Sequence, residues 1–192
     1  MTSEEARMII IDKYSNGSYL DRLTHTFGVA EMASYLADIY KIDKEQALIA
    51  AYLHDFSKYD PETDAIGVFT DSEITECNKY PFLYHAYLSA YNYKKLGGDD
   101  NEIFNAIKYH VFGRPHMSKL EEIIMISDYT EKNRRYKACI ECREILLSGN
   151  MDLAIMKSLE ATINHCMKKG DEVHPVQLEV YKEYKEKLGL WN

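Results

Sequence analysis

Most of the chain carries apolar residues at steps of three and four positions, the spacing that places them on one face of an α-helix. The stretch 19–40 is the clearest case, because Leu23, Phe27, Ala30 and Ala37 keep this spacing. We find no alternation of apolar and polar residues long enough for a β-strand, and no internal repeat. The pattern predicts an all-α fold of about eight or nine helices, over residues 6–14, 19–40, 44–54, 85–96, 101–110, 119–132, 136–147, 151–169 and 175–188.

Helix-capping residues agree with these boundaries. Thr2 and Glu5 have the spacing of a capping box, and Asp43 stands directly before the third predicted helix. Pro175 stands at a first helical position, where a missing N–H is tolerated. The sequence therefore predicts one helical domain over 1–192, with a core of about 18–134 that the C-terminal helices 136–188 complete.

Residues 60–81 interrupt the helical pattern. They hold polar and small residues and two prolines, which predicts a long excursion with one short helix at most. Long excursions in compact domains are frequently functional. Whether this one closes over a substrate stays open at the level of the sequence.

Composition and charge limit the functional classes. The chain has 192 residues, of which 46% are hydrophobic and 28% charged, as in globular domains. Its 23 basic and 31 acidic residues give a formal net charge of −8. This charge disfavours broad nucleic-acid binding, because a basic face is needed to displace counterions. A small anionic substrate remains compatible with it, since a bound metal ion can reverse the local potential.

Neither a membrane span nor a secretion signal is predicted. The longest apolar runs, such as 123–126, are far shorter than the roughly 20 residues of a spanning helix. The first five residues carry two acids and no basic apolar leader. Four cysteines without the spacing of a disulfide framework are typical of a reducing compartment. Together these features predict a cytoplasmic protein.

Histidines and carboxylates supply the candidate chemistry. The adjacent pair His54 and Asp55 closes a predicted helix, where an irregular backbone lets neighbouring side chains converge. His25 lies within the preceding helix. Asp128 lies among isoleucines of a later helix, where an isolated buried charge would be too costly. These residues are therefore expected to be paired, to coordinate a metal, or to line a cleft.

Two further histidines, His85 and His110, stand at the start and near the end of their predicted helices. With the four residues above they offer imidazole and carboxylate ligands, which suit iron, manganese, cobalt, nickel or zinc without a thiolate. Two divalent ions and two carboxylates would leave a local surplus of about two positive charges. The sequence thus predicts a metal site that attracts phosphate and activates water.

The order of these residues resembles the HD-domain phosphohydrolase superfamily, whose signature is a histidine, a later His-Asp pair and a distal aspartate. Within it, the chain is similar to the YqeK-like branch of bacterial symmetrical dinucleoside tetraphosphatases. The resemblance extends over about residues 18–188, and its motifs are the segments 22–26, 54–58, 84–86, 107–110, 113–118, 128–134 and 174–175. Such an ordered set is specific, whereas a His-Asp pair alone is not.

The resemblance implies a single HD domain that hydrolyses diadenosine tetraphosphate to two ADP by means of a metal-activated water. It implies iron as the divalent transition metal, with one or two ions per chain, and manganese or cobalt as alternatives. The positions that match its metal ligands are His25, His54, Asp55 and Asp128. His85 and His110 match positions that hold a second metal or contact the bound phosphates.

Catalytic and nucleotide-binding positions are implied in the same way. The matching catalytic residues are Asp55, Lys58, His85 and His110. The positions that match nucleotide- or phosphate-binding residues are Arg22, Asp55, Lys58, His85, His110, Arg114, Arg134 and His174. Arginines can grip phosphate oxygens with two donors at once, whereas Lys58 is a compact charge for the phosphoryl group or the leaving oxygen. The segment 170–174 resembles the family's closing loop near the nucleotide.

Two other functions stay open at this stage. A nucleotidase or phosphatase of the HD type, acting on mononucleotides or another phosphorylated small molecule, would need only the first four ligands. A non-catalytic nucleotide-binding sensor would keep the pocket without turnover. His116 and His165 are interpreted as ordinary residues outside the site, and a homodimer is compatible with the sequence.

Overall fold

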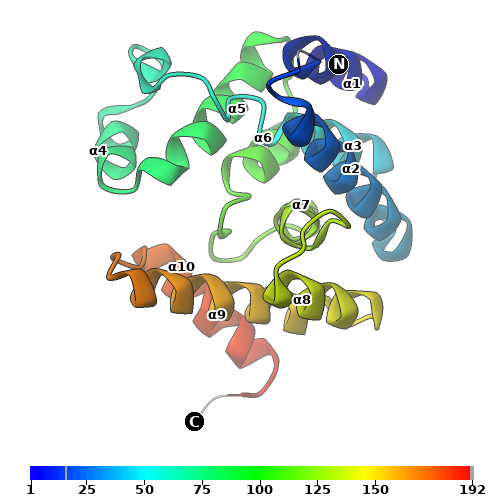
Figure 1. The fold of residues 1–192 in the computed structure, drawn as a ribbon, viewed down its shortest axis with the longest axis vertical. Helices are drawn as coiled ribbons and strands as arrows, with labels where there is room; N and C mark the ends of the chain where they lie inside the picture. The colour runs from blue at the N-terminus through cyan, green and yellow to red at the C-terminus, as the bar shows by residue number, and fades with distance from the viewer. Residues whose placement is uncertain (16, 191–192) are drawn as a thin grey trace.

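The computed structural model describes residues 1–15 and 17–190, and within them the chain forms ten α-helices and no β-strand (Figure 1). The α-helices are α1 (Ser3–Tyr14), α2 (Leu20–Tyr40), α3 (Lys44–Leu53), α4 (Asp71–Lys79), α5 (Tyr84–Lys95), α6 (Asn101–Lys108), α7 (Lys119–Thr130), α8 (Lys137–Leu147), α9 (Met151–Lys169) and α10 (Pro175–Lys187). The predicted all-α class is confirmed. None of the described helices is long and apolar enough to cross a membrane.

The segment 60–81 holds more helix than its sequence indicated. It contains α4 between two 3₁₀-helices, η1 (Glu62–Ala65) and η2 (Pro81–Leu83), so the described part of the chain has one α-helix more than the predicted range. Thr70 and Glu73 form a capping box at the start of α4. Only Ile74 and Cys77 among its nine residues are apolar, which explains the weak periodic signal.

Five helices end one or two residues earlier than predicted, and three of these ends precede candidate site residues. α3 ends at Leu53, α6 ends at Lys108 and α7 ends at Thr130. Directly after α7, the backbone of Glu131 turns to an extended conformation, with φ −57° and ψ 152°. His54 after α3 keeps helical dihedral angles, whereas Tyr109 after α6 and Glu131 after α7 leave the regular helix. The candidate site is thus built where helices terminate.

The helices α2, α3 and α7 build the centre of the molecule and contact one another. The buried side chains at this centre include Ala30, Ala33 and Ala37 of α2, Ala47, Ala50 and Ala51 of α3, and Ile123, Ile124 and Ile126 of α7. Small side chains let helices approach closely. Since the same three helices carry or precede His25, His54 and Asp128, this packing brings the predicted ligands near one another.

The last three helices form a layer across one end of the molecule, below α7 in Figure 1. α7 contacts both α8 and α9, and α10 packs on α9. One hydrophobic cluster contains residues from Ala6 in α1 to Tyr184 in α10. This continuity supports a single domain, although the boundaries 1–192, 18–134 and 136–188 stay predictions.

Candidate active site

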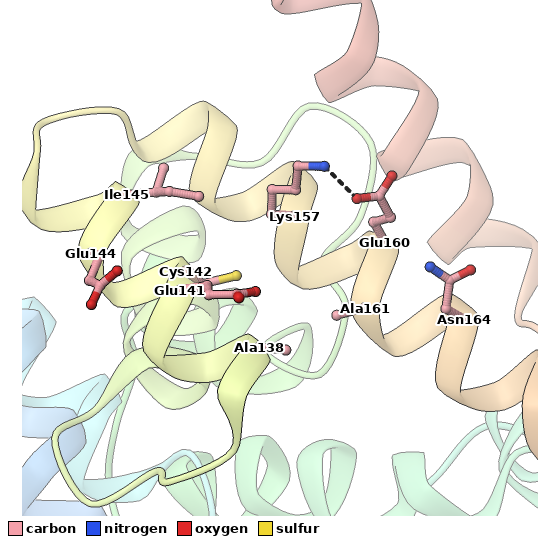
Figure 2. Close-up of a pocket in the computed structure, with 9 residues that line it drawn as sticks. All are labelled: Ala138, Glu141, Cys142, Glu144, Ile145, Lys157, Glu160, Ala161 and Asn164. Carbon is pink, nitrogen blue, oxygen red and sulfur yellow. Dashed lines mark hydrogen bonds and ion pairs between the residues drawn. The ribbon is translucent and has the colours of Figure 1, made fainter.

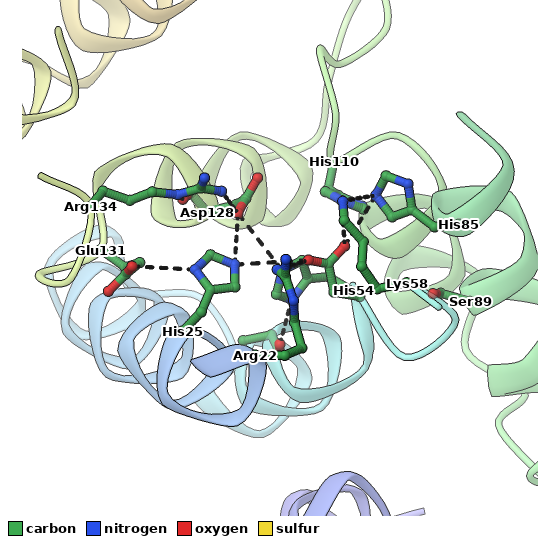
Figure 3. Close-up of polar contacts among 12 residues, drawn as sticks. Arg22, His25, His54, Lys58, His85, Ser89, His110, Asp128, Glu131 and Arg134 are labelled. Carbon is green, nitrogen blue, oxygen red and sulfur yellow. Dashed lines mark hydrogen bonds and ion pairs between the residues drawn. The ribbon is translucent and has the colours of Figure 1, made fainter. Parts of the chain in front are cut away.

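One buried cluster gathers side chains from distant parts of the chain (Figure 3). Its members are Arg22 and His25 from α2, His54, Asp55 and Lys58 from the end of α3 and the turn after it, His85 from α5, His110 from the turn after α6, Asp128 from α7 and Arg134 from the turn after α7. The structure thus brings together every predicted site residue except Arg114 and His174.

Asp55 lies at the centre of this cluster, and its two carboxylate oxygens contact different partners. Oδ1 lies 3.0 Å from Nε2 of His85 and 3.6 Å from Nε2 of His110. Oδ2 lies 3.5 Å from Nε2 of His54 and also pairs with the guanidinium group of Arg22. Burial alone would raise the pKa of this carboxyl, but the surrounding imidazoles hold its pKa well below the ordinary range. Asp55 is therefore an anion at the centre of the site.

Backbone carbonyl groups orient two of the histidines. Nδ1 of His54 lies 2.7 Å from the carbonyl oxygen of Ala51, and Nδ1 of His110 lies 2.8 Å from that of Ile107. A carbonyl oxygen only accepts hydrogen bonds, so each Nδ1 carries a hydrogen and donates it. In the neutral ring, Nε2 then presents a lone pair to the cluster. Burial lowers the pKa of His54 to about 3, which keeps that ring neutral.

His25 lies between two carboxylates. Its Nε2 is 3.0 Å from Oδ1 of Asp128, and its Nδ1 is 3.2 Å from Oε1 of Glu131. Burial would lower the pKa of His25, but the two carboxylates raise it above the ordinary value. A carboxylate on the outer nitrogen of a histidine is the arrangement that orients metal-ligating imidazoles. Glu131 is thus part of the site, although the sequence alone indicated no role for it.

A glycine in α2 leaves the space that Glu131 occupies. A Cβ atom on Gly28 would lie 2.2 Å from Oε2 of Glu131. The same oxygen accepts a hydrogen bond of 2.6 Å from the backbone N–H of Asn133. The signal available in the sequence was a glycine inside a regular helical pattern, three residues after the candidate ligand His25.

Two overlapping sets of side chains fit a metal ion. His25, His54 and Asp128 form one set, and His54, Asp55 and His110 form the other; the ligand atoms of each set lie within 4.8 Å of one another. Among the described residues, Nε2 of His25, Nε2 of His54 and Oδ1 of Asp55 are buried without a well-aligned hydrogen bond. Buried polar atoms are nearly always satisfied, so these three atoms are suited to a cation. Their imidazole and carboxylate chemistry suits a borderline divalent metal.

Three cationic side chains border the cluster. Arg22 pairs with the central carboxylate, Nη2 of Arg134 lies 2.7 Å from Oδ1 of Asp128, and Nζ of Lys58 lies 3.0 Å from Nε2 of His85. Their side chains are 18%, 35% and 31% exposed, respectively, so each reaches toward solvent. Three cations thus border the cluster on its solvent side, although each also pairs with a carboxylate of the cluster.

A cavity of about 280 Å³ extends from the cluster to the C-terminal layer. His85, His110 and Asp128 form one part of its lining, and residues of α9 and α10 form another. His165, interpreted from the sequence as an ordinary residue, also lines this cavity. The metal-ligand cluster and a space for a larger organic group are thus continuous.

Arg114 and His174 lie outside the cluster. Arg114 donates two hydrogen bonds to Glu121, at 2.6 and 3.1 Å. Nδ1 of His174 accepts the backbone N–H of Val176 at the start of α10, and its Nε2 lies 3.0 Å from Oε1 of Glu76 in α4. His174 therefore joins α4 to α10, and the nucleotide contacts predicted for both residues stay predictions.

A second hollow, of about 520 Å³, lies between α8 and α9 (Figure 2). None of the predicted site residues lines it. Its charged groups are three glutamates and Lys157, whose Nζ lies 2.7 Å from a carboxylate oxygen of Glu160. Among the described residues, no set of side chains that could hold a metal lies in this hollow, and its one lysine is paired with Glu160.

The fold and the cluster together define the class of protein: an all-helical domain that gathers a histidine, a His-Asp pair and a distal aspartate at one buried site. The chain belongs to the HD domain family, whose sequence model matches residues 22–133. This match covers the segment that carries the whole metal-ligand cluster.

Relatives narrow the comparison further. The chain is 32% identical to the symmetrical bis(5'-nucleosyl)-tetraphosphatase of Bacillus subtilis (strain 168), over 91% of this chain and 93% of that protein. The protein of the same name from Staphylococcus aureus (strain NCTC 8325 / PS 47) is 29% identical over 96% of this chain and 95% of its own length. A crystal structure from Clostridium acetobutylicum, described as a predicted HD superfamily hydrolase involved in NAD metabolism, superposes with a TM-score of 0.82 at 30% identity, over 96% of this chain and 97% of that one.

Proposed function

We propose that this chain is a metal-dependent hydrolase that splits diadenosine tetraphosphate, or a related dinucleoside polyphosphate, symmetrically into two nucleoside diphosphates. The observation that carries the proposal is the pair of metal-ligand sets that share His54. The relatives named for this reaction align with 91% and 96% of the chain, and their names supply the substrate class. The runner-up substrates are mononucleotides, which need fewer positive contacts.

In the described part of the chain, the buried ligand atoms without a well-aligned hydrogen bond, which are Nε2 of His25, Nε2 of His54 and Oδ1 of Asp55, support a bound divalent metal. The residues that would hold one ion are His25, His54, Asp55 and Asp128, and a second ion would add His85 and His110. When bound, such an ion lowers the pKa of a coordinated water and polarises a phosphoryl oxygen. We propose iron as the native metal; manganese and cobalt accept the same ligands, so availability decides among them.

The chain's own cations would receive the polyphosphate. Arg22 and Arg134 each hold a carboxylate of the cluster and still reach toward solvent, where a guanidinium group can bind phosphate oxygens through two donors. Lys58, beside His85, supplies a compact charge for the leaving oxygen. Asp55 itself is nearly inaccessible to solvent, so its contacts with Arg22 and the histidines are stronger than the same contacts would be in bulk water.

The test is product identification after anaerobic incubation of the purified chain, loaded with Fe²⁺ or Mn²⁺, with diadenosine tetraphosphate. We expect ADP as the sole nucleotide product. Asp55→Asn should lower kcat/KM by at least about a hundredfold, because a ligand charge is lost from the site. His116→Ala is the matched control, since that imidazole is 91% exposed and lies outside the cluster. A folded Asp55→Asn variant with the wild-type rate, or AMP and ATP as products, would contradict the proposal.

The same incubations separate the other two functions. Faster phosphate release from AMP or ADP than from the dinucleotide would show a nucleotidase. Tight ADP binding without turnover in the presence of iron, manganese or cobalt would show a sensor.

Location and assembly belong to the same proposal. The four free cysteines, three of them buried, support a reducing compartment, and we propose the cytoplasm. The partners we propose are the dinucleotide substrate and its nucleoside diphosphate product, while a homodimer and the absence of nucleic-acid and membrane partners stay predictions.

A further inference from the structure

We infer that the cavity beside the metal cluster binds one purine base of the substrate and selects a base with an exocyclic amino group, through the amide oxygen of Gln177. This inference rests on the proposed function and deepens it, because it names which base the site prefers. It concerns α9 and α10, which lie outside the segment 22–133 matched by the family.

Two aromatic side chains give the cavity an apolar wall. Phe112, which is 7% exposed, and Phe82, which is 43% exposed, line it, with ring centroids 6.1 Å apart and planes at 73°. Aromatic side chains are the usual stacking surfaces for nucleobases. The volume of about 280 Å³ is just below the range of small-molecule sites, about 300–1,000 Å³, which suits a part of the dinucleotide such as one nucleoside better than the whole.

The hydroxyl group of Thr162 determines which way the Gln177 amide points. Oγ1 of Thr162 donates its single hydrogen to carbonyl oxygens of its own helix, those of Ser158 and Leu159, each at 3.0 Å. Oγ1 can therefore only accept from Gln177, and the contact of 2.7 Å must come from the Nε2 side of the amide. If the amide were flipped, so that Oε1 and Nε2 exchanged places, Oε1 of Gln177 and Oγ1 of Thr162 would face each other as two acceptors.

This orientation leaves Oε1 of Gln177 as the acceptor without a partner in the described part of the protein, on a side chain that lines the cavity. Gln177 is 4% exposed and lines the cavity. Among the residues that the structure describes, no hydrogen bond reaches this oxygen. A ligand that covers this oxygen must offer a donor, since an acceptor that loses water without gaining a partner is unfavourable. The amino group of adenine is such a donor, and glutamine amides recognise adenine in this way.

Hypoxanthine provides the comparison, because it differs from adenine by a carbonyl oxygen in place of the amino group. That oxygen would face Oε1 of Gln177, acceptor against acceptor. The experiment therefore compares kcat/KM for diadenosine and diinosine tetraphosphate with the metal-loaded wild type. We expect a preference for the adenine substrate of at least about tenfold.

Two variants test the assignment. Gln177→Leu removes the acceptor and should bring the two substrates within about twofold of each other. Thr162→Val keeps the side-chain shape but frees the amide to rotate, so the preference should narrow by several-fold through a gain with diinosine tetraphosphate. Should Gln177→Leu fail to fold, Gln177→Asn withdraws the oxygen by one methylene and should also narrow the preference.

Thr75→Val is the matched control. Oγ1 of Thr75 makes the same kind of bond to its own helix, 2.8 Å to the carbonyl oxygen of Asp71, but Thr75 does not line the cavity. This variant should keep the wild-type preference.

Calorimetric titration with ADP and IDP separates this inference from the proposed function. If the wild type hydrolyses neither dinucleotide, the proposed function fails, and tighter binding of ADP that Gln177→Leu abolishes still supports the inference. Three results would overturn the inference about Gln177. They are equal kcat/KM values for the adenine and hypoxanthine substrates in the wild type, an unchanged preference for adenine in Gln177→Leu, and binding of neither ADP nor IDP.

Discussion

At the scale of single residues, the group that contacts Nδ1 of a histidine determines whether its Nε2 presents a lone pair to the cluster. His54 and His110 donate Nδ1–H to carbonyl groups three residues earlier, and His25 has a carboxylate at the same atom. The carboxylate belongs to Glu131, which fits only because Gly28 lacks a Cβ atom. This contact joins residues 28 and 131, which are far apart in the chain, so the glycine within the helical pattern marks one side of the contact but does not identify its partner.

We expect Gly28→Ala to weaken metal binding about 10- to 100-fold, because the new methyl group would push Glu131 away from Nδ1 of His25. The measurement is calorimetric titration of the metal-free chain with Mn²⁺. Alanine favours a helix over glycine by about 1 kcal/mol, so thermal denaturation should show that the loss is not due to unfolding.

The control for this prediction is a double-mutant comparison. In a Glu131→Ala background, Gly28→Ala should cost no further metal affinity, since the clashing carboxylate is gone. Equal losses in both backgrounds would show that the methyl group acts through another contact.

At the scale of elements, the C-terminal layer holds the end of α7 in place. Arg143 of α8 donates hydrogen bonds of 2.6, 2.6 and 2.7 Å to the carbonyl oxygens of Thr130, Glu131 and Arg134. A cation at the C-terminal end of a helix also interacts favourably with the helix dipole. The turn held in this way carries Glu131, which contacts His25, and Arg134, which contacts Asp128. α8 therefore acts on the site without reaching it.

Arg143→Met should lower the free energy of unfolding by about 2 kcal/mol, because three carbonyl groups lose a charged donor. It should also weaken Mn²⁺ binding several-fold, as the turn at 130–134 loosens. Urea denaturation and metal titration measure the two effects. The control Arg135→Met removes the same charge from an exposed residue and should change neither the free energy of unfolding nor that of metal binding by more than about 0.5 kcal/mol. An Arg143→Met variant as stable as wild type would refute the holding role.

At the scale of the whole molecule, the fold places several buried carboxylates close together inside an acidic chain. Asp55 and Glu131 are nearly inaccessible to solvent, and His25 contacts both Asp128 and Glu131. Burying negative charge is unfavourable unless cations balance it. Arg22 and Arg134 balance part of it, and a divalent metal would balance the remainder. Metal binding should therefore stabilise the whole domain as well as enable the chemistry.

Removal of the metal by a chelator should lower the melting temperature by roughly 5–10 °C when the metal was present at about a hundred times its Kd, a stabilisation of about 2.7 kcal/mol. Differential scanning calorimetry before and after chelation measures this shift. A His25→Ala variant should show a much smaller shift, because it lacks a ligand of the first set. A shift of the same size in both proteins would place the bound metal elsewhere.

The sequence by itself determined the all-helical class and the order of histidines and aspartates that marks the family. Both are local information: helical periodicity is read within a few turns, and a motif is read along the chain. The sequence pattern was least informative over α4, where the two apolar residues Ile74 and Cys77 are too few to form a periodic apolar face.

Only the tertiary structure decided which of these residues meet. Arg114 and Arg134 both stand in turns beside helices, yet one pairs with Glu121 and the other with Asp128. The supporting contacts of Glu131, Arg143 and Gln177 likewise depend on how α2, α7, α8, α9 and α10 pack. Packing follows from the burial of the whole apolar surface at once, so contacts between distant residues are settled only when the complete core forms.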